Sequence, residues 1–130
     1  NLRALEDIDA DPGAAEKGIV LHRVLELFIR QYPDHLPENA TAVLLECGRQ
    51  VFKETNIPPE VHAFWWPRFE NLARAFPLIE EKWREKARPL LQEAKGAYSF
   101  ETPGGQFTLT AKADRIDLMH DGKLAIIDYK

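Results

Sequence analysis

Acidic residues and a lysine occupy the closing segment of the chain, which otherwise has the apolar pattern of a β-hairpin. This segment reads ADRIDLMHDGKLAIIDYK, with Asp114 and Asp117 on one expected strand and Asp128 and Lys130 on the next. Asp128 and Lys130 are two residues apart and therefore share one face of an extended strand. Charged groups at the end of a buried strand lose hydration, so the pattern predicts either a solvated ion pair or a functional site.

A hairpin folded at Asp121-Gly122 brings an upstream carboxylate close to Asp128. Two carboxylates held close together repel one another, and a bound divalent cation relieves this repulsion. Hard oxygen ligands suit Mg²⁺ or Mn²⁺, and a nearby lysine stabilises developing negative charge or orients an attacking water. The Asp…Asp-x-Lys pattern is therefore suited to hydrolysis of a phosphodiester.

The length of the hairpin loop decides which upstream aspartate shares the face of Asp128. A strict two-residue loop at Asp121-Gly122 puts Asp117 on that face and directs Asp114 away from it. A loop with an odd number of residues, or a bulge, puts Asp114 there instead. The residue pattern alone leaves both registers open.

Helices are expected before the hairpin. The expected segments are a linker over residues 1–13 and helices over residues 14–31, 38–55 and 60–87. Pro67 and Pro77 are expected to kink or divide the third helix. Its aromatic side chains are interpreted as packing groups rather than as a stacking surface for bases; they are Phe64, Trp65, Trp66 and Phe69. The charged run EEKWREKAR at residues 80–88 is expected to be solvated.

Strands are expected after Pro89. Residues 97–101 and 106–119 alternate, with a turn at residues 103–105, and the apolar run at residues 124–127 is consistent with a central strand. The chain then divides into a linker (1–13), a helical part (14–88) and a β part (94–130). Helices packed on a three-strand antiparallel sheet define the α+β class.

The composition restricts the class of protein. Of the 130 residues, 45% are hydrophobic and 29% charged, as in a globular chain. The net charge of −4 shows no basic excess, so contact with DNA would need a local patch, a metal or a surface outside this chain. The single cysteine, Cys47, fits a reducing compartment, and no apolar run approaches the roughly 20 residues of a membrane span. Because the chain starts on Asn1 and stops within a strand pattern, we interpret it as a piece of a longer protein.

The sequence resembles the RecB-like form of the PD-(D/E)xK nucleases. In that form an Asp on one strand precedes Asp-Tyr-Lys on the next, as ADRID precedes IIDYK here. The first helix carries EKGIVLHRVLELF, which is similar to the Gly-x-x-x-His segment of these nucleases, with Gly18 and His22 at the matching positions. The likeness covers most of the chain and is nearest to the C-terminal nuclease domain of alphaproteobacterial AddB-type subunits. It implies a truncated restriction-endonuclease-like core.

The resemblance implies a catalytic set. The implied ligands of Mg²⁺ or Mn²⁺ are His22, Asp114, Asp128 and the backbone carbonyl of Tyr129. Lys130 would be the catalytic lysine. The family pattern favours Asp114 over Asp117, which is kept as the reserve ligand. Some AddB relatives hold an iron–sulfur cluster through several cysteines, and the lone Cys47 gives no support for one.

The resemblance also implies a biological role. This role is that of a metal-dependent DNA exonuclease within a helicase–nuclease complex for double-strand break repair and recombination. An AddA-type helicase subunit would be the partner, single-stranded DNA the substrate during unwinding, and the cytoplasm the location. The alternative is a catalytically silent DNA-binding or subunit-contact module that retains the nuclease fold.

Overall fold

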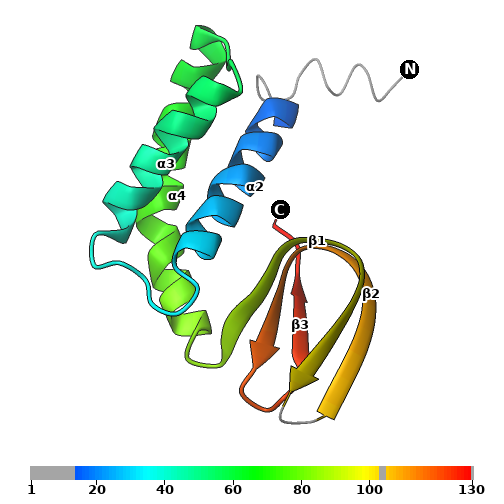
Figure 1. Ribbon diagram of the computed structural model, residues 1–130. Helices are drawn as coiled ribbons and strands as arrows, with labels where there is room; N and C mark the ends of the chain where they lie inside the picture. The colour runs from blue at the N-terminus through cyan, green and yellow to red at the C-terminus, as the bar shows by residue number, and fades with distance from the viewer. Residues whose placement is uncertain (1–13, 103–104, 130) are drawn as a thin grey trace, which may run out of the picture.

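The chain forms a bundle of helices followed by a small sheet (Figure 1). The computed structural model describes residues 14–102 and 105–129. In chain order the elements are α2 (Ala14–Gln31), α3 (Ala40–Glu54), α4 (Pro59–Trp83), β1 (Ala87–Thr102), β2 (Gly105–Met119) and β3 (Leu124–Ile127). The expected linker at residues 1–13, two residues of the expected turn (103–104) and Lys130 lie outside the described residues. The predicted α+β class is confirmed.

Helix α4 runs without a break through both of its internal prolines, so the expectation that they divide it is wrong. Trp65, Phe69 and Ala73 lie four residues apart and are 5%, 3% and 0% exposed. This spacing places them on one face of a helix, whose burial stabilises the helix where Pro67 cannot donate a backbone hydrogen bond. Pro67 itself is exposed.

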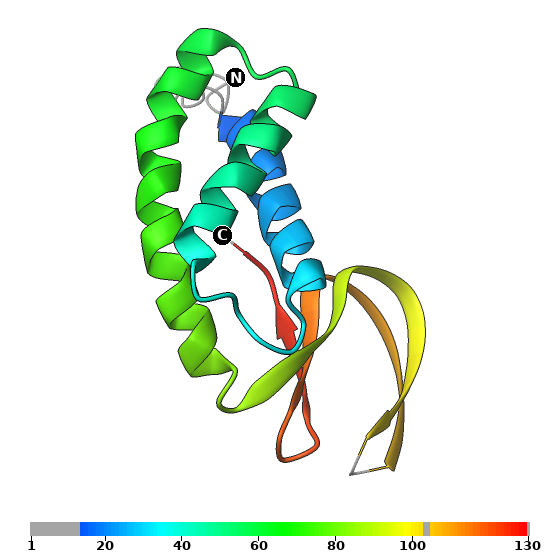
Figure 2. The same ribbon diagram turned by 60° about the vertical axis from the view of Figure 1, so that its left-hand side comes forward.

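The main core lies between the three helices of the described region. Helix α2 contributes Val24 and Phe28, α3 contributes Leu44, and α4 contributes Trp65 and Phe69, all of them buried. Figure 2 shows the three helices side by side from a second direction. The interpretation of the α4 aromatic side chains as packing groups is therefore confirmed for Trp65 and Phe69.

The sheet has the strand order β1-β2-β3, and both neighbouring pairs are antiparallel. Strand β1 begins at Ala87, earlier than the alternating pattern predicted. The register shifts between Pro89 and Leu91, and Glu93 has a positive φ of 51°, so regular alternation is lost in this part of the strand.

A three-residue loop connects β2 to β3. The Met119 amide donates to the Lys123 carbonyl at 2.8 Å, and the Gly122 amide donates to the Met119 carbonyl at 2.9 Å. Gly122 has a φ of 89°, which favours glycine and is typical of the last residue in three-residue hairpin loops. The loop therefore has an odd number of residues.

Substituting Gly48 tests how tightly the helices pack. A Cβ atom at this position would overlap the ring of Phe69, which is 3% exposed and cannot turn into solvent. Gly48→Ala should lower the free energy of unfolding by about 2 kcal/mol, because the overlap outweighs the better helix propensity of alanine. Urea denaturation measures the change.

Gly18→Ala is the matched control, because nothing lies within 4 Å of a Cβ atom there. It should leave stability unchanged or raise it by up to about 1 kcal/mol. A Gly48→Ala variant as stable as the Gly18→Ala variant would contradict the packing described here.

Candidate active site

The register of the hairpin places Asp114 beside Asp128. Arg115 pairs with Ile127, and the next residues outward along the two strands are Asp114 and Asp128. The Asp114 amide donates to Oδ1 of Asp128 at 3.3 Å, and the Tyr129 amide donates to Oδ2 of Asp114 at 2.7 Å. The odd number of residues in the loop is the physical cause of this register, since a two-residue loop would have directed Asp114 to the other face of the hairpin.

His22 reaches this end of the hairpin from helix α2. Its Nε2 donates to the Tyr129 carbonyl at 3.2 Å, although the two residues are 107 positions apart in the sequence. Its Nδ1 lies 3.6 Å from Oδ1 of Asp114. The His22 and Asp114 side chains are 41% and 17% exposed, so the cluster is accessible to a solute. An imidazole, two carboxylates and a carbonyl oxygen thus meet at one place.

Asp117 lies elsewhere and has other partners. It is three residues from Asp114 and so points to the opposite face of β2. Its carboxylate is fully buried and accepts two hydrogen bonds from Arg115, at 2.8 and 2.7 Å. Trp83 Nε1 donates a further one at 2.7 Å. The structure therefore does not bring the reserve ligand to the group that contains Asp128.

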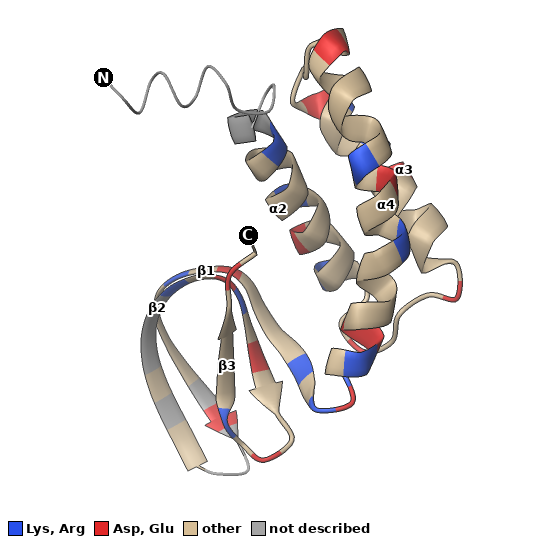
Figure 3. Cartoon of the chain, turned by 180° about the vertical axis from the view of Figure 1, so that it is seen from behind, with Lys and Arg blue, Asp and Glu red and all other residues tan. Residues whose placement is uncertain are grey.

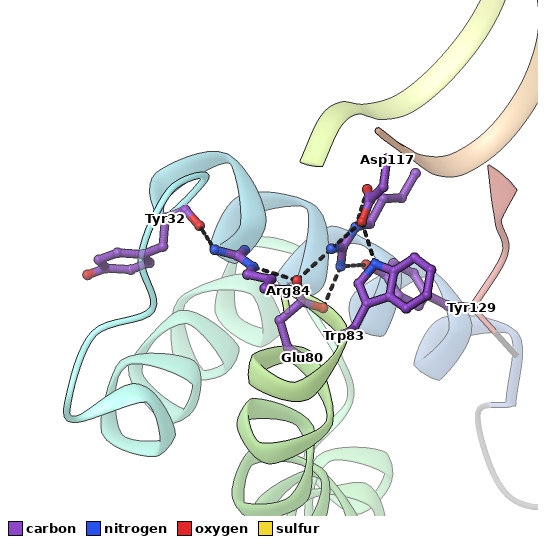
Figure 4. A network of polar contacts seen from close by, with 7 residues as sticks. Tyr32, Glu80, Trp83, Arg84, Asp117 and Tyr129 are labelled. Carbon is purple, nitrogen blue, oxygen red and sulfur yellow. Dashed lines mark hydrogen bonds and ion pairs between the residues drawn. The ribbon is translucent and has the colours of Figure 1, made fainter. Parts of the chain in front are cut away.

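The partners of Asp117 belong to a buried polar network that joins α4 to β2 (Figure 4). Arg115 donates to both oxygens of Glu80, at 2.7 and 2.5 Å. Glu80 also accepts from Nε of Arg84 at 2.7 Å, and Arg84 Nη1 donates to the carbonyl of Tyr32 at 2.6 Å. The network therefore ties the end of α4 both to the sheet and to the residue after α2.

This network corrects the expectation of a solvated run at residues 80–88 for Glu80 and Arg84 only, since the other charged residues of the run are exposed as expected. Glu80 is 3% exposed, and the Arg84 side chain is 10% exposed. Two sequence signals were available for it: the spacing of four between Glu80 and Arg84 on one helix face, and the spacing of two between Arg115 and Asp117 on one strand face. Neither signal showed that the two pairs would meet.

Burial and charge in the network shift the pKa values of Arg115 and Tyr129. Burial by itself lowers the pKa of Arg115, but the hydrogen bonds and negative charges of Glu80 and Asp117 outweigh it, so the pKa of Arg115 lies above its ordinary value. Burial raises the pKa of Tyr129, and the hydrogen bond and charge of Arg115 partly offset this rise. Arg115 therefore stays cationic, and the Tyr129 hydroxyl stays neutral near pH 7.

The donor types in the cluster fit a hard divalent cation. Carboxylate and carbonyl oxygens suit Mg²⁺ and Mn²⁺, and an imidazole is tolerated better by Mn²⁺. In the described part of the chain, no group of three or more His, Cys, Asp or Glu side chains is already arranged to hold an ion. Each of the three side chains instead hydrogen-bonds to a backbone group: His22 to the Tyr129 carbonyl, Asp114 to the Tyr129 amide and Asp128 to the Asp114 amide. The fit therefore rests on donor chemistry, and an ion would replace some of these contacts.

Charge elsewhere on the chain is mixed. Figure 3 shows acidic and basic positions interleaved along the helices and the sheet. No helix in the described ranges, 14–102 and 105–129, has the length and apolar character needed to cross a membrane.

Comparison with known proteins identifies the family. The sequence model of the PD-(D/E)XK nuclease superfamily matches residues 1–130, and the chain belongs to this family. An uncharacterized protein of Rickettsia bellii is 26% identical over 129 residues, covering 99% of this chain and 16% of the relative. An uncharacterized protein of Rickettsia conorii is 25% identical over 134 residues, with the same coverage of both chains. The chain thus spans 16% of the length of these relatives. No solved structure gives a significant match.

Asp117→Ala tests the structural role of this aspartate. The change leaves Trp83 Nε1 without its acceptor and removes one of the two carboxylates that neutralise Arg115. The free energy of unfolding should fall by about 3–5 kcal/mol, the usual effect of breaking a buried ion pair. Urea denaturation measures this loss.

The control is Asp121→Ala, in which an exposed turn carboxylate that accepts one hydrogen bond from the Lys123 amide is removed. It should cost less than about 1.5 kcal/mol. Small stability loss in Asp117→Ala together with loss of Mn²⁺ binding would instead assign Asp117 to the metal site.

Proposed function

We propose that this chain is the catalytic domain of a metal-dependent deoxyribonuclease that acts as an exonuclease. Membership of the PD-(D/E)XK superfamily supports nuclease chemistry in general. The observation that carries the narrower proposal is the meeting of His22, Asp114, Asp128 and the Tyr129 carbonyl at the end of one hairpin. These groups come from helix α2, strand β2 and the two residues that follow β3, and their donor types are those that suit a divalent ion at a phosphodiester.

The proposal gives each residue a role. Asp114 and Asp128 would hold Mg²⁺ or Mn²⁺, with His22 and the Tyr129 carbonyl completing the donor set. When bound, the ion would polarise the phosphate and make a bound water a stronger nucleophile. Lys130 lies outside the described residues, and its assignment as the catalytic lysine rests on the Asp-Tyr-Lys motif. Its ammonium would stabilise negative charge that develops on the phosphate.

The contacts within the cluster also hold Asp114 and His22 in place through the main chain of Tyr129. The Tyr129 amide binds the Asp114 carboxylate, while His22 binds the carbonyl of the same residue. Both polar groups of this residue's main chain are therefore used at the cluster. These contacts would keep the imidazole, the Asp114 carboxylate and the Tyr129 carbonyl close together before an ion binds and replaces some of them.

The proposal extends to the protein as a whole. We infer an AddB-like subunit of a helicase–nuclease complex, with an AddA-type helicase as partner and single-stranded DNA as substrate during break repair and recombination in the cytoplasm. The support is the order of the motifs along the chain: Gly18 and His22 on α2, Asp114 on β2, and Asp128 just after β3. The net charge of −4 indicates that DNA affinity depends on the bound ion or on other surfaces of the assembly.

Asp114→Asn and Asp128→Asn test the proposed function. Each removes one negative charge at the cluster with almost no change in shape. Mn²⁺ affinity should fall, and cleavage of end-labelled single-stranded DNA by the intact polypeptide should drop at least about 100-fold, since the ion contributes several kcal/mol of transition-state stabilisation. Titration calorimetry and a gel-based cleavage assay give the two readouts.

Asp121→Asn is the matched control, because this exposed aspartate lies in the hairpin turn rather than in the cluster. It should retain the affinity and activity of the unsubstituted protein. Cleavage that persists at an unchanged rate in Asp114→Asn and Asp128→Asn would refute the assignment.

A silent module is the second candidate function. The observation that favours it is that each proposed metal ligand already has a hydrogen-bond partner: both carboxylates accept from backbone amides, and His22 binds the Tyr129 carbonyl. This candidate predicts that the intact polypeptide binds single-stranded DNA equally well with and without Mn²⁺ and does not cleave it.

A further inference from the structure

Tyr129 belongs both to the candidate active site and to the buried network. Its amide donates to Asp114 at 2.7 Å, and its carbonyl accepts from His22 at 3.2 Å. Its hydroxyl accepts from Nη1 of Arg115 at 3.4 Å, while its ring packs against the core of the helical bundle. The side chain of this residue therefore contacts the network while its main chain contacts the cluster.

The Arg115 side chain is fixed in place by two buried carboxylates, independently of its contact with Tyr129. Its side chain is 1% exposed and donates two hydrogen bonds to Asp117 and two to Glu80, all between 2.5 and 2.8 Å. Glu80 is itself buried on α4 and paired with Arg84. Because both ends of the guanidinium are fixed, Arg115 offers a donor at a defined position to the Tyr129 hydroxyl.

We propose that Arg115, through the Tyr129 hydroxyl, positions the main chain of residue 129 in the active site. Arg115 is thus a positioning residue of the proposed nuclease, an inference that rests on the proposed function. The aromatic ring of Tyr129 connects its hydroxyl, which contacts Arg115, to its main chain, which contacts Asp114 and His22. Fixing the hydroxyl limits rotation of the side chain, and with it the direction of the amide and carbonyl that contact Asp114 and His22.

Three features of the geometry support this role over a purely structural one. The Arg115 guanidinium is already satisfied by two carboxylates, so Tyr129 is not needed to neutralise it. The Tyr129 ring is already packed in the core, so the hydroxyl is not needed to bury it. The contact between them nevertheless links a rigid group to Tyr129, whose main-chain amide and carbonyl both make hydrogen bonds in the cluster.

Tyr129→Phe is the leading test, because it removes the hydroxyl and keeps the ring. Mn²⁺ affinity of the intact polypeptide, measured by titration calorimetry, should weaken about 10-fold, the lower end of the effect of groups that orient metal ligands. The cleavage rate at saturating Mn²⁺ should recover most of its value, because the ligands themselves are unchanged.

Trp83→Phe is the matched control. It also removes one hydrogen-bond donor from the network, but at Asp117 rather than at residue 129. It should lower the unfolding temperature at least as much as Tyr129→Phe does and leave Mn²⁺ affinity unchanged. Equal affinities in Tyr129→Phe and the unsubstituted protein, or an equal loss in Trp83→Phe, would overturn the positioning role.

Arg115→Lys gives an independent second variant, because it keeps a cation between the two carboxylates but removes the fixed fork. Among molecules that remain folded, it should weaken Mn²⁺ binding as Tyr129→Phe does, and combining the two changes should add little. Additive losses would overturn the inferred link between them.

Asp114→Asn, measured in the same titration, distinguishes a failure of the proposed nuclease function from a failure of the positioning role of Arg115. If it abolishes Mn²⁺ binding while Tyr129→Phe has no effect, the proposed function stands and the positioning role fails. If Asp114→Asn binds Mn²⁺ as the unsubstituted protein does, the proposed function fails and the positioning role fails with it.

Discussion

A single buried guanidinium, that of Arg115, links the two parts of this fold. Its side chain is 1% exposed, and removing a charge from water is costly unless the charge is paired and hydrogen-bonded. Asp117 on the same strand and Glu80 on α4 supply this pairing, so the sheet and the helical bundle must meet at one place and in one orientation. The need to satisfy this group therefore favours the observed placement of the sheet against the end of α4.

The orientation fixed by Arg115 has a chemical consequence on the opposite face of the same strand, β2. With β2 held against α4, Asp114 points to the opposite face, where α2 supplies His22 and the end of β3 supplies Asp128. Two adjacent residues of β2 thus serve different purposes, because successive side chains of a strand alternate between its faces. The buried ion network and the candidate active site are the two sides of one strand segment, and Tyr129 contacts both.

The PD-(D/E)XK superfamily assignment and the geometry support one another at different levels. The family indicates nuclease chemistry in general, and the cluster contains the residues that we propose perform it in this chain. The hydrogen bonds among His22, Tyr129 and Asp114 show a donor set already gathered, in which an ion would compete with contacts between the donors. In the proposed nuclease, this competition would make metal affinity, rather than stability, the quantity most sensitive to small changes at residue 129.

The sequence by itself determined the element types, the first helix over residues 14–31 and the candidate residues, because apolar periodicity and the order of motifs are local properties. It left open the choice between Asp114 and Asp117, because one residue of loop length reverses every side chain of a strand, and only the closed loop at Gly122 decided the face. It misjudged Glu80 and Arg84 within the charged run, since hydration is the expected state of charged side chains until partners from distant segments replace the water. Tertiary structure decided both points, because pairing Glu80 with Arg115 and His22 with Tyr129 joins residues that no local pattern connects.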